Sequence, residues 1–77
     1  MADKKVQLEL SKDEALVFFE WLARYNKGTD QQFADQAEQR VLWDLEATLE
    51  SELAEPFAAK YDELLAAARS RVRDQQE

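Results

Sequence analysis

Apolar and polar residues alternate near the N-terminal end of the chain. Val6, Leu8 and Leu10 are separated by polar residues. This period of two places the three apolar side chains on one face, and it predicts a short β-strand over residues 4–10. A lone strand has unpaired edges. We therefore expect it either to pair antiparallel with the same strand of a second copy across a two-fold axis, or to lie over the core with its apolar side chains packed into the core.

The pattern then changes to the three- and four-residue spacing of a helix, predicted over residues 12–26. Ser11 and Glu14 fit a capping box at its start, and Gly28 can take the left-handed conformation that ends helices. At about 100° per residue the apolar positions fill an arc of roughly 220°. A helix with so wide an apolar face should be covered on several sides and form the centre of the core. These positions are Ala15, Leu16, Phe18, Phe19, Trp21, Leu22, Ala23 and Tyr25.

Two further helices are predicted, over residues 30–53 and 56–73. Thr29-Asp30-Gln31-Gln32 is a second capping-box pattern. Pro56 suits the first turn of the third helix, where its missing amide hydrogen costs nothing. The apolar stripe of the second helix comprises Phe33, Ala34, Ala37, Val41, Leu45 and Leu49, with Leu42 and Leu53 at its edge, and that of the third comprises Phe57, Tyr61, Leu64, Leu65, Ala68 and Val72.

The predicted fold class is mainly α: a single three-helix domain over residues 1–77 with a short N-terminal β-strand. A chain of 77 residues is one domain at most. Such a chain buries only roughly 60% of the surface that its unfolded form exposes. Because it has no cysteine, no disulfide can stabilise the fold. Oligomerisation is another common source of stability in small proteins, and we expect a homodimer.

The net charge of −7 is concentrated in the middle of the chain. Residues 29–55 contain one basic residue, Arg40, against eight acidic ones, whereas the flanking segments are balanced. Such a field repels phosphate backbones and anionic membranes, so we expect no nucleic acid and no membrane as partner. No apolar run is long enough for a signal peptide or a membrane span, which predicts a cytoplasmic location. The acids are Asp30, Asp35, Glu38, Asp44, Glu46, Glu50, Glu52 and Glu55.

Trp43 is the residue most suggestive of a binding surface. On the second helix it projects about 160° away from Val41 and Leu45, among polar neighbours. A tryptophan in such a place resembles an interface anchor. The alternative is that the N-terminal strand or another helix of the same chain covers it. The candidate protein interface consists of Trp43, Gln36, Gln39, Ala47, Glu50, Val6, Leu8 and Leu10.

No catalytic, cofactor-binding or metal-binding residue is predicted. Histidine and cysteine are absent, which removes the commonest general base and the commonest transition-metal ligands. The serine and threonine hydroxyls have no histidine to activate them, and one glycine cannot build a phosphate-cradling loop. Glu46 and Glu50 share a helix face and could hold a divalent cation, but solvated surface acids have the same spacing. We expect no enzyme and no cofactor.

Two segments resemble a known group of proteins. EALVFFEWLARYN over residues 14–26 and EQRVLWDLE over residues 38–46 are similar to consecutive helices of short uncharacterised bacterial helical proteins. The resemblance extends from about Val6 to Val72. It implies a bacterial cytoplasmic origin, and because no activity or ligand is assigned to that group, it implies no site residue.

The sequence therefore predicts a non-enzymatic protein–protein interaction module or a small accessory or regulatory protein. Its expected partner is a second copy or another protein. The alternative is an acidic neutraliser, similar to an immunity protein or antitoxin or mimicking nucleic acid, that binds the basic surface of a partner.

Overall fold

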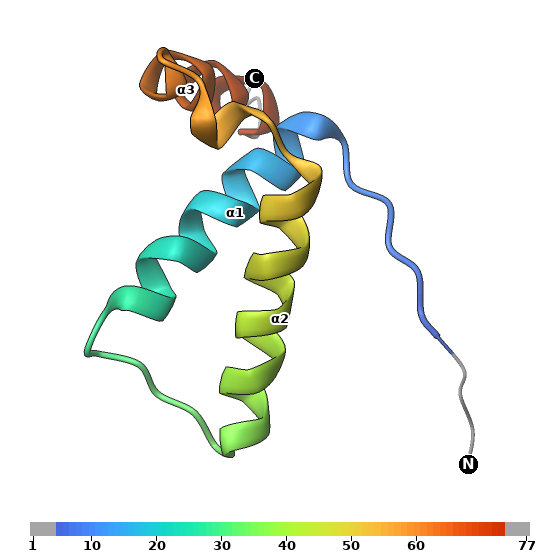
Figure 1. The fold of residues 1–77 in the computed structure, drawn as a ribbon, viewed down its shortest axis with the longest axis vertical. Helices are drawn as coiled ribbons and strands as arrows, with labels where there is room; N and C mark the ends of the chain where they lie inside the picture. Colours follow the sequence, from blue (N-terminus) through green and yellow to red (C-terminus); the bar gives the residue numbers. More distant parts are fainter. Residues whose placement is uncertain (1–4, 74–77) are drawn as a thin grey trace.

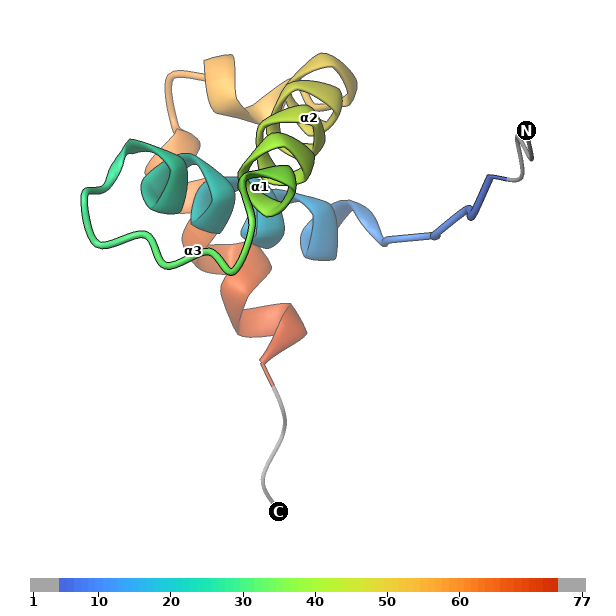
Figure 2. The same ribbon diagram turned by 90° about the horizontal axis from the view of Figure 1, so that it is seen from below.

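A computed structural model describes residues 5–73, which contain three α-helices and one 3₁₀ turn. The helix α1 lies between the other two and contacts both (Figures 1 and 2). The chain is thus mainly helical, as predicted. The elements are α1 (Lys12–Lys27), α2 (Gln36–Glu52), η1 (Glu55–Phe57) and α3 (Tyr61–Val72).

The capping box predicted for the start of α1 is confirmed. The Glu14 amide donates to Ser11 Oγ at 3.0 Å, and the Ser11 amide donates to Glu14 Oε1 at 2.9 Å. Ser11 itself is extended, with φ −65° and ψ 162°. The two hydrogen bonds satisfy amides that the first turn leaves without helical partners, and they fix the direction from which the chain approaches the helix.

The prediction that Gly28 ends α1 in a left-handed conformation is wrong. Gly28 is not left-handed but extended, with φ −75° and ψ 170°. The Gly28 amide donates to Tyr25 O at 3.2 Å. The side chain of Gln31 adds two further hydrogen bonds, from its Nε2 to Tyr25 O at 2.8 Å and to Asn26 O at 2.9 Å. A side-chain amide thus completes the cap that a left-handed glycine would supply through the backbone alone.

The second helix begins at Gln36, six residues after the predicted start at residue 30. Asp35 is its N-cap, accepting a hydrogen bond from the Ala37 amide at 2.8 Å. Glu38 reaches back to accept from the Ala34 amide at 2.9 Å. The Thr29-Asp30-Gln31-Gln32 pattern does not start a helix, and residues 28–35 form a loop. The Gln32 amide, which a Thr29 cap would bind, donates to the Tyr25 hydroxyl instead.

The hydrophobic core lies at one end of the α1–α2 pair. Leu16 and Phe19 of α1 meet Leu53, which follows α2, and Leu65 and Ala68 of α3 complete the cluster. Figure 1 shows α1 and α2 close together at this end and splayed apart toward the loop that joins them. We call the first the closed end and the second the open end. Most of the buried residues therefore lie at one end of the molecule, while Leu22 of α1 is buried outside this cluster.

The face that α2 turns toward α1 differs from the predicted stripe. Leu49 packs against the core and Leu53 is buried, whereas Val41 is 54% exposed. Ala34 and Ala37 are also exposed. The helix is thus turned about its axis, so that the predicted edge of the stripe faces α1 and the predicted centre of the stripe lies partly in solvent. One reason is that α3 packs on a different side of α1 and leaves α1 as the main neighbour of α2 (Figure 2).

Pro56 lies in η1, which begins at Glu55, rather than in a continuous third helix, and α3 starts only at Tyr61. The predicted helix over residues 56–73 is thus divided into a 3₁₀ turn and a shorter α-helix. Its C-terminal part is bound to the start of α1, because Arg71 forms two hydrogen bonds with Asp13, at 2.6 and 2.9 Å.

Residues 5–10, which we call the arm, form no β-strand in the described part of the chain, while residue 4 of the predicted strand lies outside it. The arm runs away from the helices in both views (Figures 1 and 2). Val6 and Leu8 are 87% and 81% exposed, so the arm does not lie over the core of its own chain. Within residues 5–73, no helix has the length and apolar character that a membrane span requires.

Candidate functional site

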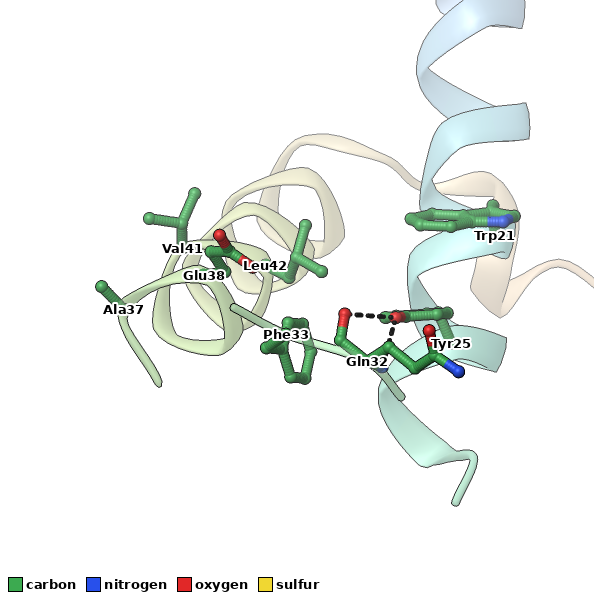
Figure 3. A pocket seen from close by; sticks show the side chains of 8 residues that line it. All are labelled: Trp21, Tyr25, Gln32, Phe33, Ala37, Glu38, Val41 and Leu42. Carbon is green, nitrogen blue, oxygen red and sulfur yellow. Dashed lines mark hydrogen bonds between the residues drawn. The ribbon is translucent and has the colours of Figure 1, made fainter. Parts of the chain in front are cut away.

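A groove opens between α1 and α2 at the open end of the molecule. One wall is formed by the C-terminal half of α1 and the other by the N-terminal half of α2, and the loop closes one side (Figure 3). Its volume is about 490 Å³. Most of the lining is apolar, as is typical of protein and ligand binding sites. The lining residues are Trp21, Tyr25, Gln32, Phe33, Ala37, Glu38, Val41 and Leu42.

An aromatic ladder forms the α1 wall of this groove. The rings of Trp21 and Tyr25, one helical turn apart, are stacked with centroids 4.9 Å apart. Phe33 of the loop meets Tyr25 edge to face, with centroids 5.8 Å apart. Trp21 nevertheless remains 41% exposed. Stacked and edge-to-face contacts hold aromatic rings in fixed positions, so a partner would meet a preformed apolar wall.

Hydrogen bonds from Tyr25 hold the loop against α1. The Gln32 amide donates to the Tyr25 hydroxyl at 3.0 Å, and that hydroxyl donates to the Gln32 carbonyl at 3.5 Å (Figure 3). Gln31 joins the same loop to the end of α1 through its two capping bonds. The side of the groove that the loop forms is therefore fixed by polar contacts, while the surface facing the groove stays apolar.

A polar contact beside the groove determines how α2 faces α1. Asn26 Nδ2 donates to Glu46 Oε1 at 2.7 Å and to Leu42 O at 3.4 Å. Glu46 therefore points toward α1, while Glu50 is exposed. The acidic pair considered from sequence is thus divided between a structural contact and the solvent. Within residues 5–73, no group of three or more carboxylates gathers as metal ligands would.

Comparison of the chain with protein-family models, with curated proteins and with solved structures finds no match.

Trp43 does not line the groove but lies on the opposite flank of α2 from Val41, about 160° away at 100° per residue. It is 42% exposed. Of the residues predicted to surround it, Gln39 is half-buried and its Nε2 donates to Gln31 Oε1 at 3.4 Å. The others are exposed, so α2 carries one half-exposed apolar side chain on each flank. These exposed neighbours are Gln36, Ala47 and Glu50.

The arm residues of the predicted interface, Val6, Leu8 and Leu10, lie in solvent. Leu10, nearest to α1, is the least exposed of them at 45%.

Sequence reasoning assigned the groove residues Trp21, Tyr25, Phe33 and Val41 to the core. The signal that could have identified them is the width of the apolar arc on α1. Two neighbouring helices cannot cover an arc of roughly 220°, and with α2 and α3 on different sides the remainder faces the groove.

Proposed function

We propose that this protein is a non-enzymatic protein–protein interaction module, homodimeric, whose groove between α1 and α2 receives an apolar polypeptide segment. The observation that carries the proposal is the aromatic wall at the open end, in which Trp21 is exposed and Tyr25 and Phe33 are half-buried. The expected cytoplasmic and bacterial origin is part of the same proposal.

The composition of the groove supports protein binding. Tryptophan and tyrosine are enriched among the residues that contribute most to interface affinity, and charged residues are depleted at interface centres. Here Glu38 is the one acidic side chain among the eight that line the groove. Trp43 offers a second apolar contact on the other flank of α2, where it is the proposed anchor of a further part of the interface.

The first test is the solution mass of the full chain by light scattering over a roughly hundredfold concentration range around micromolar concentrations. Wild type should show a dimer, and Trp21→Ala should shift the equilibrium toward monomer, because truncating an interface anchor commonly costs at least about 2 kcal/mol. Trp43→Ala measures how much the second flank of α2 contributes to dimerisation. The helical circular dichroism of both variants should be retained, because each side chain is about two-fifths exposed. A wild type that remains monomeric throughout would contradict the homodimer.

Salt dependence separates this proposal from an acidic neutraliser of a basic partner. The carboxylates Asp44, Glu50 and Glu52 are exposed on α2, so the alternative also has a surface to use. Exposed charges are screened beyond about 10 Å at 0.1 M salt, so binding through them should weaken steeply with ionic strength. Association through the groove should change little, because apolar burial carries it.

A further inference from the structure

We propose that the groove is filled by the arm of a second copy of this chain, each of two copies inserting residues 5–10 into the groove of the other. The inference rests on the proposed function, because it names the occupant of the same groove. The chain carries both an apolar segment without cover and an apolar groove without an occupant. A two-fold axis would make the two insertions identical, so each groove is completed by residues of the partner copy.

The spacing of the arm matches the spacing of the groove walls. In an extended segment Val6 and Leu8 lie about 6.7 Å apart on one face, because each residue advances about 3.3 Å. Trp21 and Tyr25 on α1, four residues apart, repeat after about 6 Å. Ala37 and Val41 repeat after the same distance on the facing wall. Two successive apolar side chains of the arm can therefore enter between two successive pairs of wall residues.

Charge favours the same arrangement. Lys5 precedes Val6 at the outer part of the described arm, and Glu38 lies on the rim of the groove. Asp30 and Asp35, in the loop that closes the groove, are exposed. With Val6 toward the loop and Leu8 toward Trp21, the lysine comes beside these acids. The contact is solvated, so it sets the direction of insertion more than its strength.

A second copy is a better occupant than the arm of the same chain. Figure 1 shows the arm descending from the start of α1 on one side of α2, with α1 on the other side. The groove opens between α1 and α2. To enter its own groove, the arm would have to pass around α2. On its present course Val6 and Leu8 stay in solvent, where they can meet another molecule.

The area available predicts a weak dimer. A standard interface buries about 800 Å² per partner over 20–30 residues, or roughly 30 Å² per residue. Six arm residues and eight groove residues per copy would then bury about 400–450 Å² on each partner, below the range of stable complexes. Exchange of the arms alone should therefore give a monomer–dimer equilibrium that depends on concentration, and the mass should be measured over a roughly hundredfold range around micromolar concentrations.

The decisive variants place the same charge on opposite faces of the arm. Leu8→Asp puts a carboxylate on the apolar face and should weaken dimerisation of the full chain by more than about tenfold, which corresponds to about 1.4 kcal/mol. Gln7→Asp is the matched control, because side chains alternate along an extended segment and residue 7 points away from the groove. Its dissociation constant should stay within about threefold of wild type. Val41→Glu should weaken dimerisation as Leu8→Asp does, since it places a charge in the groove wall at a half-exposed position.

Mixing the two defective proteins tests the exchange itself. Leu8→Asp has an intact groove and Val41→Glu has an intact arm, so a mixed dimer contains one wild-type insertion. The mixture should form heterodimers, detected by native mass spectrometry, more strongly than either variant forms homodimers. Antiparallel pairing of two arms as strands would give no such rescue, because Val41→Glu would then dimerise normally. That result would overturn the proposal.

Other outcomes separate this inference from the proposed function. If Val41→Glu dissociates the dimer but Leu8→Asp does not, the groove binds a different part of the second copy, so the inference is wrong while the proposed function stands. In a Trp43→Phe background, the fluorescence of Trp21 alone reports on the groove. If the wild-type chain is monomeric yet Leu8→Asp changes this fluorescence, the arm fills its own groove and the exchange is wrong. If the chain is monomeric and Leu8→Asp changes nothing, both proposals fail.

Discussion

Among individual residues, Asp13 and Arg71 show how a polar pair holds two helices together at the closed end. The guanidinium forms two hydrogen bonds with the carboxylate, and these lower the pKa of Asp13 below its ordinary value of 3.8. A carboxyl group whose pKa is lower in the folded than in the unfolded state stabilises the fold above its unfolded pKa. That stabilisation is lost as the pH falls through the folded pKa. Glu55, paired with Lys12 at 3.0 Å, has its pKa lowered in the same direction.

We predict that removing the guanidinium returns Asp13 toward its ordinary behaviour. In a carbon NMR titration, the wild-type pKa of Asp13 should lie below 3.8, and in Arg71→Gln it should rise. The unfolding midpoint of Arg71→Gln should be lower than that of wild type at pH 7, with the difference shrinking as the pH falls below the ordinary pKa. Arg40→Gln, which changes an exposed arginine in α2, is the control. An unchanged Asp13 titration in Arg71→Gln would show that the pair does not persist in solution.

At the scale of the elements, the rotation of α2 about its axis decides which side chains are core and which are groove. Leu49 packs against the core, whereas Val41 stands at the groove wall. Leu49→Ala should therefore lower the free energy of unfolding by about 2–3 kcal/mol, as expected for deletion of a largely buried leucine. Val41→Ala should change it by less than about 1 kcal/mol. Urea unfolding, measured at a concentration where the chain is monomeric, gives the two losses in free energy of unfolding. Equal losses for the two variants would mean that the predicted stripe was correct.

Sequence patterns predict the helices better than their ends and faces. The Ser11–Glu14 box involves neighbours in sequence, so the start of α1 could be read directly. The conformation of the loop could not be predicted in this way, because Gln31 caps α1 only when the chain has turned back toward that helix. The Asn26–Glu46 bond, which orients α2, likewise joins residues 20 positions apart. The alternation of Val6, Leu8 and Leu10 predicts an extended segment, but whether that segment becomes a strand depends on a partner that one chain does not provide.

Across the whole molecule, the hydrophobic core and the proposed binding groove lie at opposite ends. The cluster that α1 and α3 form with Leu53 lies at the closed end, and the groove occupies the open end. Such separation is physically reasonable, because regions with few buried contacts open at low free energy and binding sites are drawn from them. It also explains why Trp21 is exposed although it belongs to the helix that contacts both others.

This separation predicts a gradient of amide hydrogen exchange along α2. In dilute, monomeric protein, the Leu49 amide should exchange at least about tenfold more slowly than the Val41 amide, because its end of the helix packs on the core. Raising the protein concentration should slow exchange at Val41, since a bound arm stabilises the open end in proportion to its occupancy. Leu8→Asp should keep the gradient but lose its dependence on concentration. Equal protection at both positions in the monomer would mean that the molecule opens as one unit, and the groove would then be as rigid as the core.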